Sequence, residues 1–97
     1  MRSFQESLWI IAYDSPSNSR RRKVAHLLEG YGVRVQWSVF ECRLRGDEAR
    51  VLEHRLRRLI RLDEDSVRLW PLPESSCARI LQLGRSTPTN EWHDPIV

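Results

Sequence analysis

Leu8-Trp9-Ile10-Ile11-Ala12-Tyr13-Asp14 is the stretch of sequence that decides the fold. Its six apolar or aromatic residues follow one another without alternation, which is typical of a strand covered on both faces. The charged Asp14 comes where such a strand ends. Ser15-Pro16-Ser17-Asn18-Ser19 then turns the chain and offers several helix N-caps before the basic run Arg20-Arg21-Arg22-Lys23. A carboxylate and a block of cations therefore flank one short loop.

That loop has the residue types for handling phosphate. We predict that Asp14 holds a divalent cation and that the arginines hold a nucleic-acid backbone. Four cations in the first turn of a helix are unfavourable, each by a few tenths to about 1 kcal/mol, because the helix dipole is positive there. A bound anion would offset this cost. The alternative is a solvated basic surface whose repulsion is screened by salt.

The composition is that of one small folded domain. The 97 residues are 40% hydrophobic and 30% charged, which is an ordinary globular balance. The net charge of +3 arises from 16 basic and 13 acidic residues, so the placement of charge says more about partners than its sum. A chain this short buries a small fraction of its surface, and we therefore expect a homodimer.

Cysteine spacing and the length of the apolar runs restrict the class of protein. Cys42 and Cys77 form no CxxC pair, and the histidines lack zinc-ligand spacing, so we predict two reduced thiols. The residues before Leu8 lack the features of a signal peptide, and no apolar run approaches the roughly 18 residues of a membrane span. We therefore predict a cytoplasmic protein that does not enter a membrane.

Two amphipathic helices are predicted from the spacing of apolar residues. The first covers about 18–30, and its buried face consists of Val24, Leu27, Leu28 and Tyr31. The second begins at Gly46 with an acidic first turn, which suits the helix dipole. Apolar residues form its buried stripe: Ala49, Leu52, Leu56, Leu59 and Ile60. Basic residues form a second stripe: Arg50, His54, Arg57 and Arg61. A basic stripe of this kind is more often solvated surface than a nucleic-acid site.

Three further strands complete the predicted core. Within Val33–Leu44 the apolar residues change from odd to even positions, so we predict two strands, at about 33–37 and 38–44. Val67–Trp70 alternates as a half-buried strand that Pro71 closes. The element order predicts an α+β, ferredoxin-like βαββαβ fold, whose antiparallel sheet carries both helices on one face. We also predict Ile80–Gly84 as an extra C-terminal edge strand that pairs with another protomer.

We expect a single ferredoxin-like domain over residues 1–97, with its core at about 8–84. The C-terminal tail, 85–97, is polar with isolated apolar anchors at Trp92, Ile96 and Val97. Because it has no core of its own, the tail is expected to be disordered or packed on the partner protomer.

Several segments together resemble the CRISPR-associated Cas2 family. They are Tyr13-Asp14, then Arg21–Ala25 with Tyr31-Gly32, then Arg34–Cys42, and last Asp65-Ser66-Val67-Arg68. Members of that family are small dimeric ferredoxin-like proteins that pair with the Cas1 integrase during acquisition of new spacers. The resemblance covers roughly residues 8–84 in consistent order.

The resemblance implies a set of site residues. Asp14 matches the family's proposed magnesium ligand and catalytic carboxylate, with two copies meeting near the dimer axis so that Mg²⁺ lies between protomers. Basic residues match its nucleic-acid clamps: Arg20, Arg21, Arg22 and Arg34. Ser15 would join the water network around the metal, and Phe40 would pack near the site.

Two functions from different classes follow from this resemblance. The first is a metal-dependent endonuclease, a homodimer that cleaves phosphodiester bonds of RNA or double-stranded DNA during spacer acquisition. The alternative is a non-catalytic dimeric adapter that binds duplex DNA and bridges Cas1 integrase dimers, which requires the arginines but not Asp14. A toxin-like RNA interferase on the same fold is a third interpretation, which the Arg34–Cys42 motif disfavours.

Overall fold

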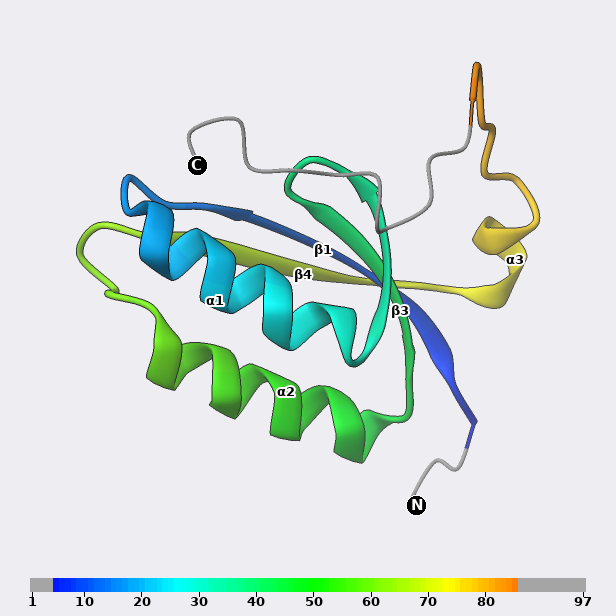
Figure 1. Ribbon diagram of the computed structural model, residues 1–97. Coiled ribbons are helices and arrows are strands. Elements are labelled where there is room, and N and C mark those ends of the chain that lie inside the picture. The colour runs from blue at the N-terminus through cyan, green and yellow to red at the C-terminus, as the bar shows by residue number, and fades with distance from the viewer. Residues whose placement is uncertain (1–4, 86–97) are drawn as a thin grey trace.

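The computed structural model describes residues 5–85, and these form an α+β protein with one antiparallel sheet (Figure 1). The elements in chain order are β1 (Ser7–Asp14), α1 (Asn18–Glu29), β2 (Gly32–Gln36), β3 (Val39–Leu44), α2 (Gly46–Leu59), β4 (Ser66–Leu72) and the short α3 (Glu74–Cys77). The four strands lie in the order β2-β3-β1-β4, and α1 and α2 cover one face of the sheet (Figure 1). The predicted ferredoxin-like core is confirmed.

β1 lies inside the sheet, between β3 and β4. Its unbroken apolar run predicts cover on both faces, and within the described residues the middle of the strand is covered on the helix-facing side alone. On its helix-facing side, Ile11 and Tyr13 are buried in the core. On the opposite face, Ile10 and Ala12 are only half-buried, because no helix or strand within residues 5–85 covers the middle of that face. Strand alternation also places Asp14 at the end of this open face.

The core fills the space between the sheet and the two long helices. α1 and α2 contribute the apolar residues that their spacing predicts, and β1 and β3 contribute alternate residues. The side chains that are fully or almost fully buried include Ile11, Val24, Leu28, Phe40, Cys42, Leu44, Leu52 and Leu56. The position of the helices relative to the sheet therefore follows from one continuous apolar cluster.

The predicted division of Val33–Leu44 into two strands is confirmed. β2 ends at Gln36, Trp37 and Ser38 form the turn, and β3 begins at Val39. The pairing between the strands shifts in register between Arg34 and Gln36. The change of apolar phase has another cause: Arg34 is buried opposite Phe40 on the core face, whereas Val33, opposite Glu41, is 54% exposed on the other face.

β4 extends further than predicted, because Pro71 lies within the strand instead of closing it. Pro71 pairs with Trp9 of β1, and β4 is an edge strand of the sheet. A proline is tolerated there because its missing N–H can face the edge that has no neighbouring strand.

The predicted C-terminal strand at Ile80–Gly84 is wrong for the single chain, because these residues form no strand. The chain leaves β4 at Pro73, makes the one turn of α3, and continues with Leu81 and Leu83 exposed at 87% and 89%. A strand needs a neighbouring edge for its backbone hydrogen bonds, and the turn at α3 carries this segment away from the free edge of β4 (Figure 1). Pairing with another protomer remains a prediction. The predicted tail anchors Trp92, Ile96 and Val97 lie outside the described residues.

The sequence predicts reduced cysteines and no membrane-spanning segment. Cys42, which is buried, and Cys77 are both free thiols. In the part of the chain from 5 to 85, none of the helices combines the length and the apolar character that a membrane crossing requires.

Candidate functional site

Asp14 lies exposed at the C-terminal end of the central strand β1. Its sheet partner is Ser66, the first residue of β4, so that the β1–α1 loop and the start of β4 meet at this end of the sheet. The strand is held on both sides, and the carboxylate therefore projects from a rigid element. This position is the one that the sequence predicts for a ligand-binding carboxylate.

The loop after Asp14 is held by its own hydroxyl groups. Ser15 is buried, and its Oγ accepts a hydrogen bond from the backbone N–H of Ser17 at 3.1 Å. Ser17 is the N-cap of α1, and its Oγ accepts from the backbone N–H of Arg20 at 3.1 Å. The direction of the first turn of α1 is thus fixed relative to the end of β1.

Arg20 binds two carboxylates of the α2–β4 loop. Its Nε lies 2.7 Å from Asp65 Oδ2 and its Nη2 lies 3.2 Å from Asp65 Oδ1, a two-pronged contact, while Nη2 also lies 2.6 Å from Glu64 Oε1. The Arg20 side chain is 19% exposed and the Asp65 side chain 1%. Arg20 therefore ties α1 to the start of β4, and the surface around Asp14 receives little of its guanidinium group.

Asp65 is the most extensively bonded carboxylate at this end of the sheet. Besides Arg20, it accepts a hydrogen bond from the backbone N–H of Arg61 at 2.8 Å and one from the Ser15 side chain. The hydrogen bond from Arg20 is the main cause that lowers the pKa of Asp65 to about 2, against the opposing effect of burial. The same bond raises the pKa of Arg20 above its ordinary value. Asp65 is therefore ionised at every physiological pH.

Arg21 and Arg22 point away from that ion pair. Arg21 donates from Nη1 to the backbone carbonyl of Ser15 at 2.7 Å and from Nη2 to the side-chain oxygen of Asn18. Its guanidinium group thus lies against the loop that follows Asp14. Arg22 is exposed on the outer side of the first turn. Of the three predicted helix-start clamps, Arg22 is exposed, whereas Arg20 and Arg21 are half-buried.

Arg34 is buried and not on the surface that the sequence predicts for a clamp. Its side chain lies on the helix-facing side of the sheet, where Nη2 donates to the Tyr13 hydroxyl at 3.0 Å. The guanidinium carbon lies 5.5 Å from the centre of the Trp37 ring and 5.3 Å from that of Phe40. Phe40 itself has no exposed surface. Both residues lie beside Tyr13, the neighbour of Asp14 in β1, since Arg34 binds the Tyr13 hydroxyl and the Phe40 ring lies 6.3 Å from the Tyr13 ring.

The remaining acidic and nucleophilic groups do not extend the site. Within residues 5–85, no three side chains of His, Cys, Asp or Glu gather where a metal ion could bind. Burial raises the pKa of the Cys42 thiol to about 11, so it is protonated and inert at neutral pH. Asp14 thus presents an exposed carboxylate at the end of β1, whereas Asp65 and Glu64 are bound to Arg20.

Sequence reasoning missed the role of Asp65. We placed it in an acidic turn and in the motif that opens β4, but not in contact with Arg20 and Ser15. The sequence alone carries no signal for this contact, because it depends on the pairing of Asp14 with Ser66, which sets the residue before Ser66 beside the β1–α1 loop.

The fold and the site together define a class: a small ferredoxin-like protein with a fixed, exposed carboxylate beside helix-start arginines, an arrangement suited to nucleic acid. The particular family then follows from comparison with known proteins. The family described as CRISPR associated protein Cas2 matches residues 7–80, and the chain belongs to this family.

Relatives with curated names cover most of the chain. A Synechocystis protein named CRISPR-associated endoribonuclease Cas2 3 is 54% identical over 65 residues, which are 67% of this chain and 71% of the relative. A Thermus thermophilus protein named CRISPR-associated endonuclease Cas2 2 is 48% identical over 65 residues, 67% of this chain and 72% of the relative.

Solved structures share the fold. A hypothetical protein from Thermus thermophilus superposes with a TM-score of 0.76 at 40% identity, covering 84% of this chain and 95% of that one. Streptococcus pyogenes Cas2 gives a TM-score of 0.72 at 35% identity, covering 79% and 99%. A chain of a partial Cas6-RT-Cas1–Cas2 complex gives 0.71 at 30% identity, covering 79% and 90%.

Proposed function

We propose that this chain is a CRISPR spacer-acquisition protein that acts as a metal-dependent endonuclease, cleaving phosphodiester bonds of RNA or double-stranded DNA as a homodimer in the cytoplasm. The exposed carboxylate of Asp14, fixed at the end of β1 next to the start of α1, is the observation that carries the proposal. The names of the relatives, which are endonucleases and endoribonucleases, agree with it.

Asp14 suits Mg²⁺ as one of a small number of protein ligands. Magnesium takes oxygen ligands, retains several waters and is commonly held by one or two carboxylates. When bound, the ion would activate a water molecule for attack or stabilise the leaving oxygen of the phosphodiester. A second copy of the chain, related by a two-fold axis, would supply the second carboxylate.

The open face of the sheet supports the homodimer. Ile10, Ala12 and Val39 are half-buried there, and Trp70, the sheet partner of Ile10, is 41% exposed. Asp14 ends the same face, so two copies that cover each other's apolar middle would bring their Asp14 carboxylates toward each other.

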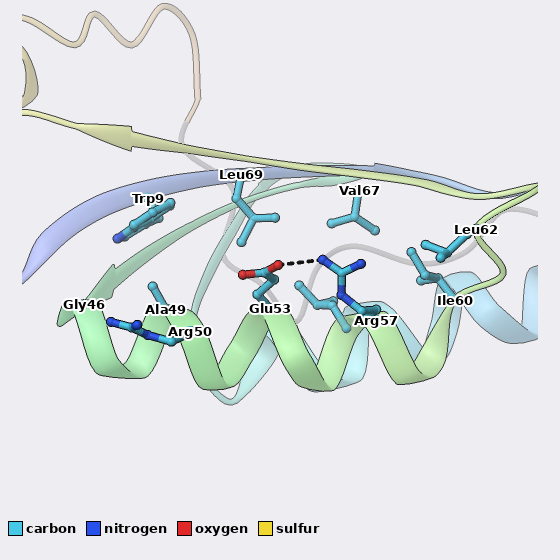
Figure 2. A pocket seen from close by; sticks show the side chains of 11 residues that line it. Trp9, Gly46, Ala49, Arg50, Glu53, Arg57, Ile60, Leu62, Val67 and Leu69 are labelled. Atoms are coloured by element: carbon cyan, nitrogen blue, oxygen red, sulfur yellow. Dashed lines mark hydrogen bonds and ion pairs between the residues drawn. The ribbon is translucent and has the colours of Figure 1, made fainter.

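A groove between α2 and β4 offers a second contact for the partner protomer (Figure 2). Trp9, Val67 and Leu69 line its sheet side, and a 2.7 Å ion pair between Glu53 and Arg57 lies across it on α2. The groove runs beside the free edge of β4. We propose that Ile80–Gly84 of the partner adds a strand to this edge, with alternate apolar side chains in the groove.

The arginines divide into two roles in this proposal. Arg21 and Arg22 hold the phosphate backbone, since they lie at the surface of the first turn of α1. Arg20 orients that turn through Asp65, and Arg34 supports the end of β1 through Tyr13. Ser15 holds the loop after Asp14 and not the metal.

Cleavage of labelled RNA and duplex DNA, with Mg²⁺ or with EDTA, tests the endonuclease. Asp14→Asn keeps the volume of the side chain and removes its charge, so we expect Mg²⁺-dependent cleavage to fall by at least about 100-fold. Asp63→Asn is the matched control, because Asp63 is an exposed carboxylate of the α2–β4 loop. Cleavage by the Asp14 variant at the wild-type rate would refute the catalytic role.

The non-catalytic adapter is the second candidate. It is favoured by the structural similarity to a chain of a complex that contains Cas1 and Cas2. The adapter predicts that Asp14→Asn binds duplex DNA and co-elutes with Cas1 like the wild type. It also predicts that neither the wild type nor Asp14→Asn cleaves RNA or duplex DNA. Cleavage that depends on both Mg²⁺ and Asp14 would exclude this candidate as the whole function.

A further inference from the structure

A basic groove runs between α1 and α2 on the outer side of the helical layer, away from the sheet. We call it the helical groove, and its polar walls consist of Arg22, Lys23 and His26 of α1 and Arg55 of α2. Leu27 and Tyr31 are among the residues at its base. Among the described residues that line it, none is acidic. The first turn of α1, where the groove begins, follows directly from the loop after Asp14.

Lys23 and Arg55 of this groove differ from two nearby cations, Arg57 of α2 and Arg61 of the loop after α2. Arg57 is bound to Glu53 at 2.7 Å and Arg61 lies 3.6 Å from Asp63, so each has a carboxylate to neutralise it. Within the part of the chain that the structure describes, Lys23 has no carboxylate at salt-bridge distance, nor has Arg55. Lys23 and Arg55 therefore place positive charge in the groove that no carboxylate of the described residues neutralises, whereas His26 lies 4.0 Å from Glu29.

The side chain of Arg55 is restricted by Tyr31 in a position where its guanidinium group can bind an anion. Its Nη1 donates to the Tyr31 hydroxyl at 2.8 Å, and its guanidinium carbon lies 5.7 Å from the centre of the Tyr31 ring. A guanidinium group has five N–H donors, and this contact uses one of them. Because the ring already restricts the side chain, less conformational entropy is lost when the remaining donors bind a phosphate.

From these contacts we infer that the helical groove binds a nucleic-acid backbone, as a continuation of the surface beside Asp14. α1 has 12 residues and so is about 18 Å long, a length along which one strand of a duplex presents about five phosphates. The inference rests on the proposed function for its ligand class, but it assigns binding to Lys23 and Arg55, which lie outside the predicted clamps.

The dependence of binding on salt tests this assignment. Binding of fluorescent duplex DNA, and separately of single-stranded RNA, is measured by anisotropy in EDTA, so that cleavage does not interfere. For the double variant Lys23→Gln with Arg55→Gln, the slope of log Kobs against log salt for duplex DNA should become shallower by about 1.8 for each protomer contacted. For RNA the expected change is about 1.4, and a change with only one of the two polymers identifies which one the groove binds.

Two further variants separate charge from fold. Arg55→Lys loses the guanidinium contact with Tyr31 but keeps the charge, so its slope should stay near the wild-type value. Arg57→Gln removes a cation that Glu53 already neutralises and should also leave the slope unchanged. A wild-type slope in the double variant with both polymers, or an equal change in Arg57→Gln, would overturn the inference.

The two proposals fail separately. If the double variant keeps the wild-type slope while cleavage still requires Asp14, the helical groove is refuted and the endonuclease stands. If Asp14→Asn retains full cleavage but the salt slope of the double variant is shallower, the catalytic role of Asp14 is refuted and the helical groove stands.

Discussion

Replacing Asp65 by asparagine removes the charge on which the start of α1 and the start of β4 both depend. The carboxylate has a pKa of about 2 in the folded chain, compared with 3.8 for an aspartate free of such contacts. Each unit of pKa difference corresponds to about 1.4 kcal/mol, so the ionised form stabilises the fold by about 2 kcal/mol at neutral pH. For a domain of this size, that loss lowers Tm by about 8–16 °C.

The pH dependence gives the prediction its sharpest form. Because the folded-state pKa is lowered, the stabilisation is fully present above the unfolded value near 3.8 and is lost as the pH falls through about 2. Thermal unfolding of wild type and Asp65→Asn is followed by circular dichroism at a fixed protein concentration, since dimerisation makes Tm depend on concentration. The Tm difference should be constant from about pH 5 to 7 and should narrow below pH 4.

Asp63→Asn is the control for this experiment. Asp63 lies in the same loop, 72% exposed and 3.6 Å from Arg61, and a surface pair of this kind contributes at most about 1 kcal/mol. A Tm for Asp65→Asn within about 2 °C of the wild type at pH 7 would show that the Arg20–Asp65 contact does not hold the two elements together. If the Tm difference between wild type and Asp65→Asn stayed constant below pH 4, the charge of the Asp65 carboxylate would not be its cause.

Three more substitutions test the packing around the site. Gly32→Ala should cost at least about 1–3 kcal/mol in denaturant unfolding, because its Cβ would overlap the backbone carbonyl of Glu41; a wild-type midpoint would contradict this close approach. Ser17→Ala removes the N-cap of α1 and should cost about 1 kcal/mol in urea unfolding, with Ser17→Thr losing less. Arg34→Met should lower Tm without changing the salt dependence of DNA binding, since the side chain is 7% exposed; a shallower slope would place Arg34 on the binding surface after all.

Much of the fold was open to prediction because its signals are local. The spacing of Val24 and Leu28 marks the buried face of α1, and the apolar run from Leu8 to Tyr13 marks the strand β1. The change of apolar phase near Trp37 to Phe40 predicted a break between two strands, and the structure has a turn at Trp37 and Ser38. The prediction that the strand ends at Pro71 was wrong, because a proline is tolerated within an edge strand such as β4.

The features of the site also divide into those that local sequence predicts and those that depend on the tertiary structure. From the sequence alone, Asp14 could be placed at a strand end beside a cluster of arginines, because both features depend only on neighbours in the chain. Which arginines face solvent was decided by the tertiary structure, since Arg20 meets Asp65 only when α1 packs beside the start of β4, and Arg34 meets Tyr13 only across the sheet. Apolar periodicity specifies which face of an element is buried, whereas the partner of a charged side chain depends on segments far apart in sequence that the fold brings together.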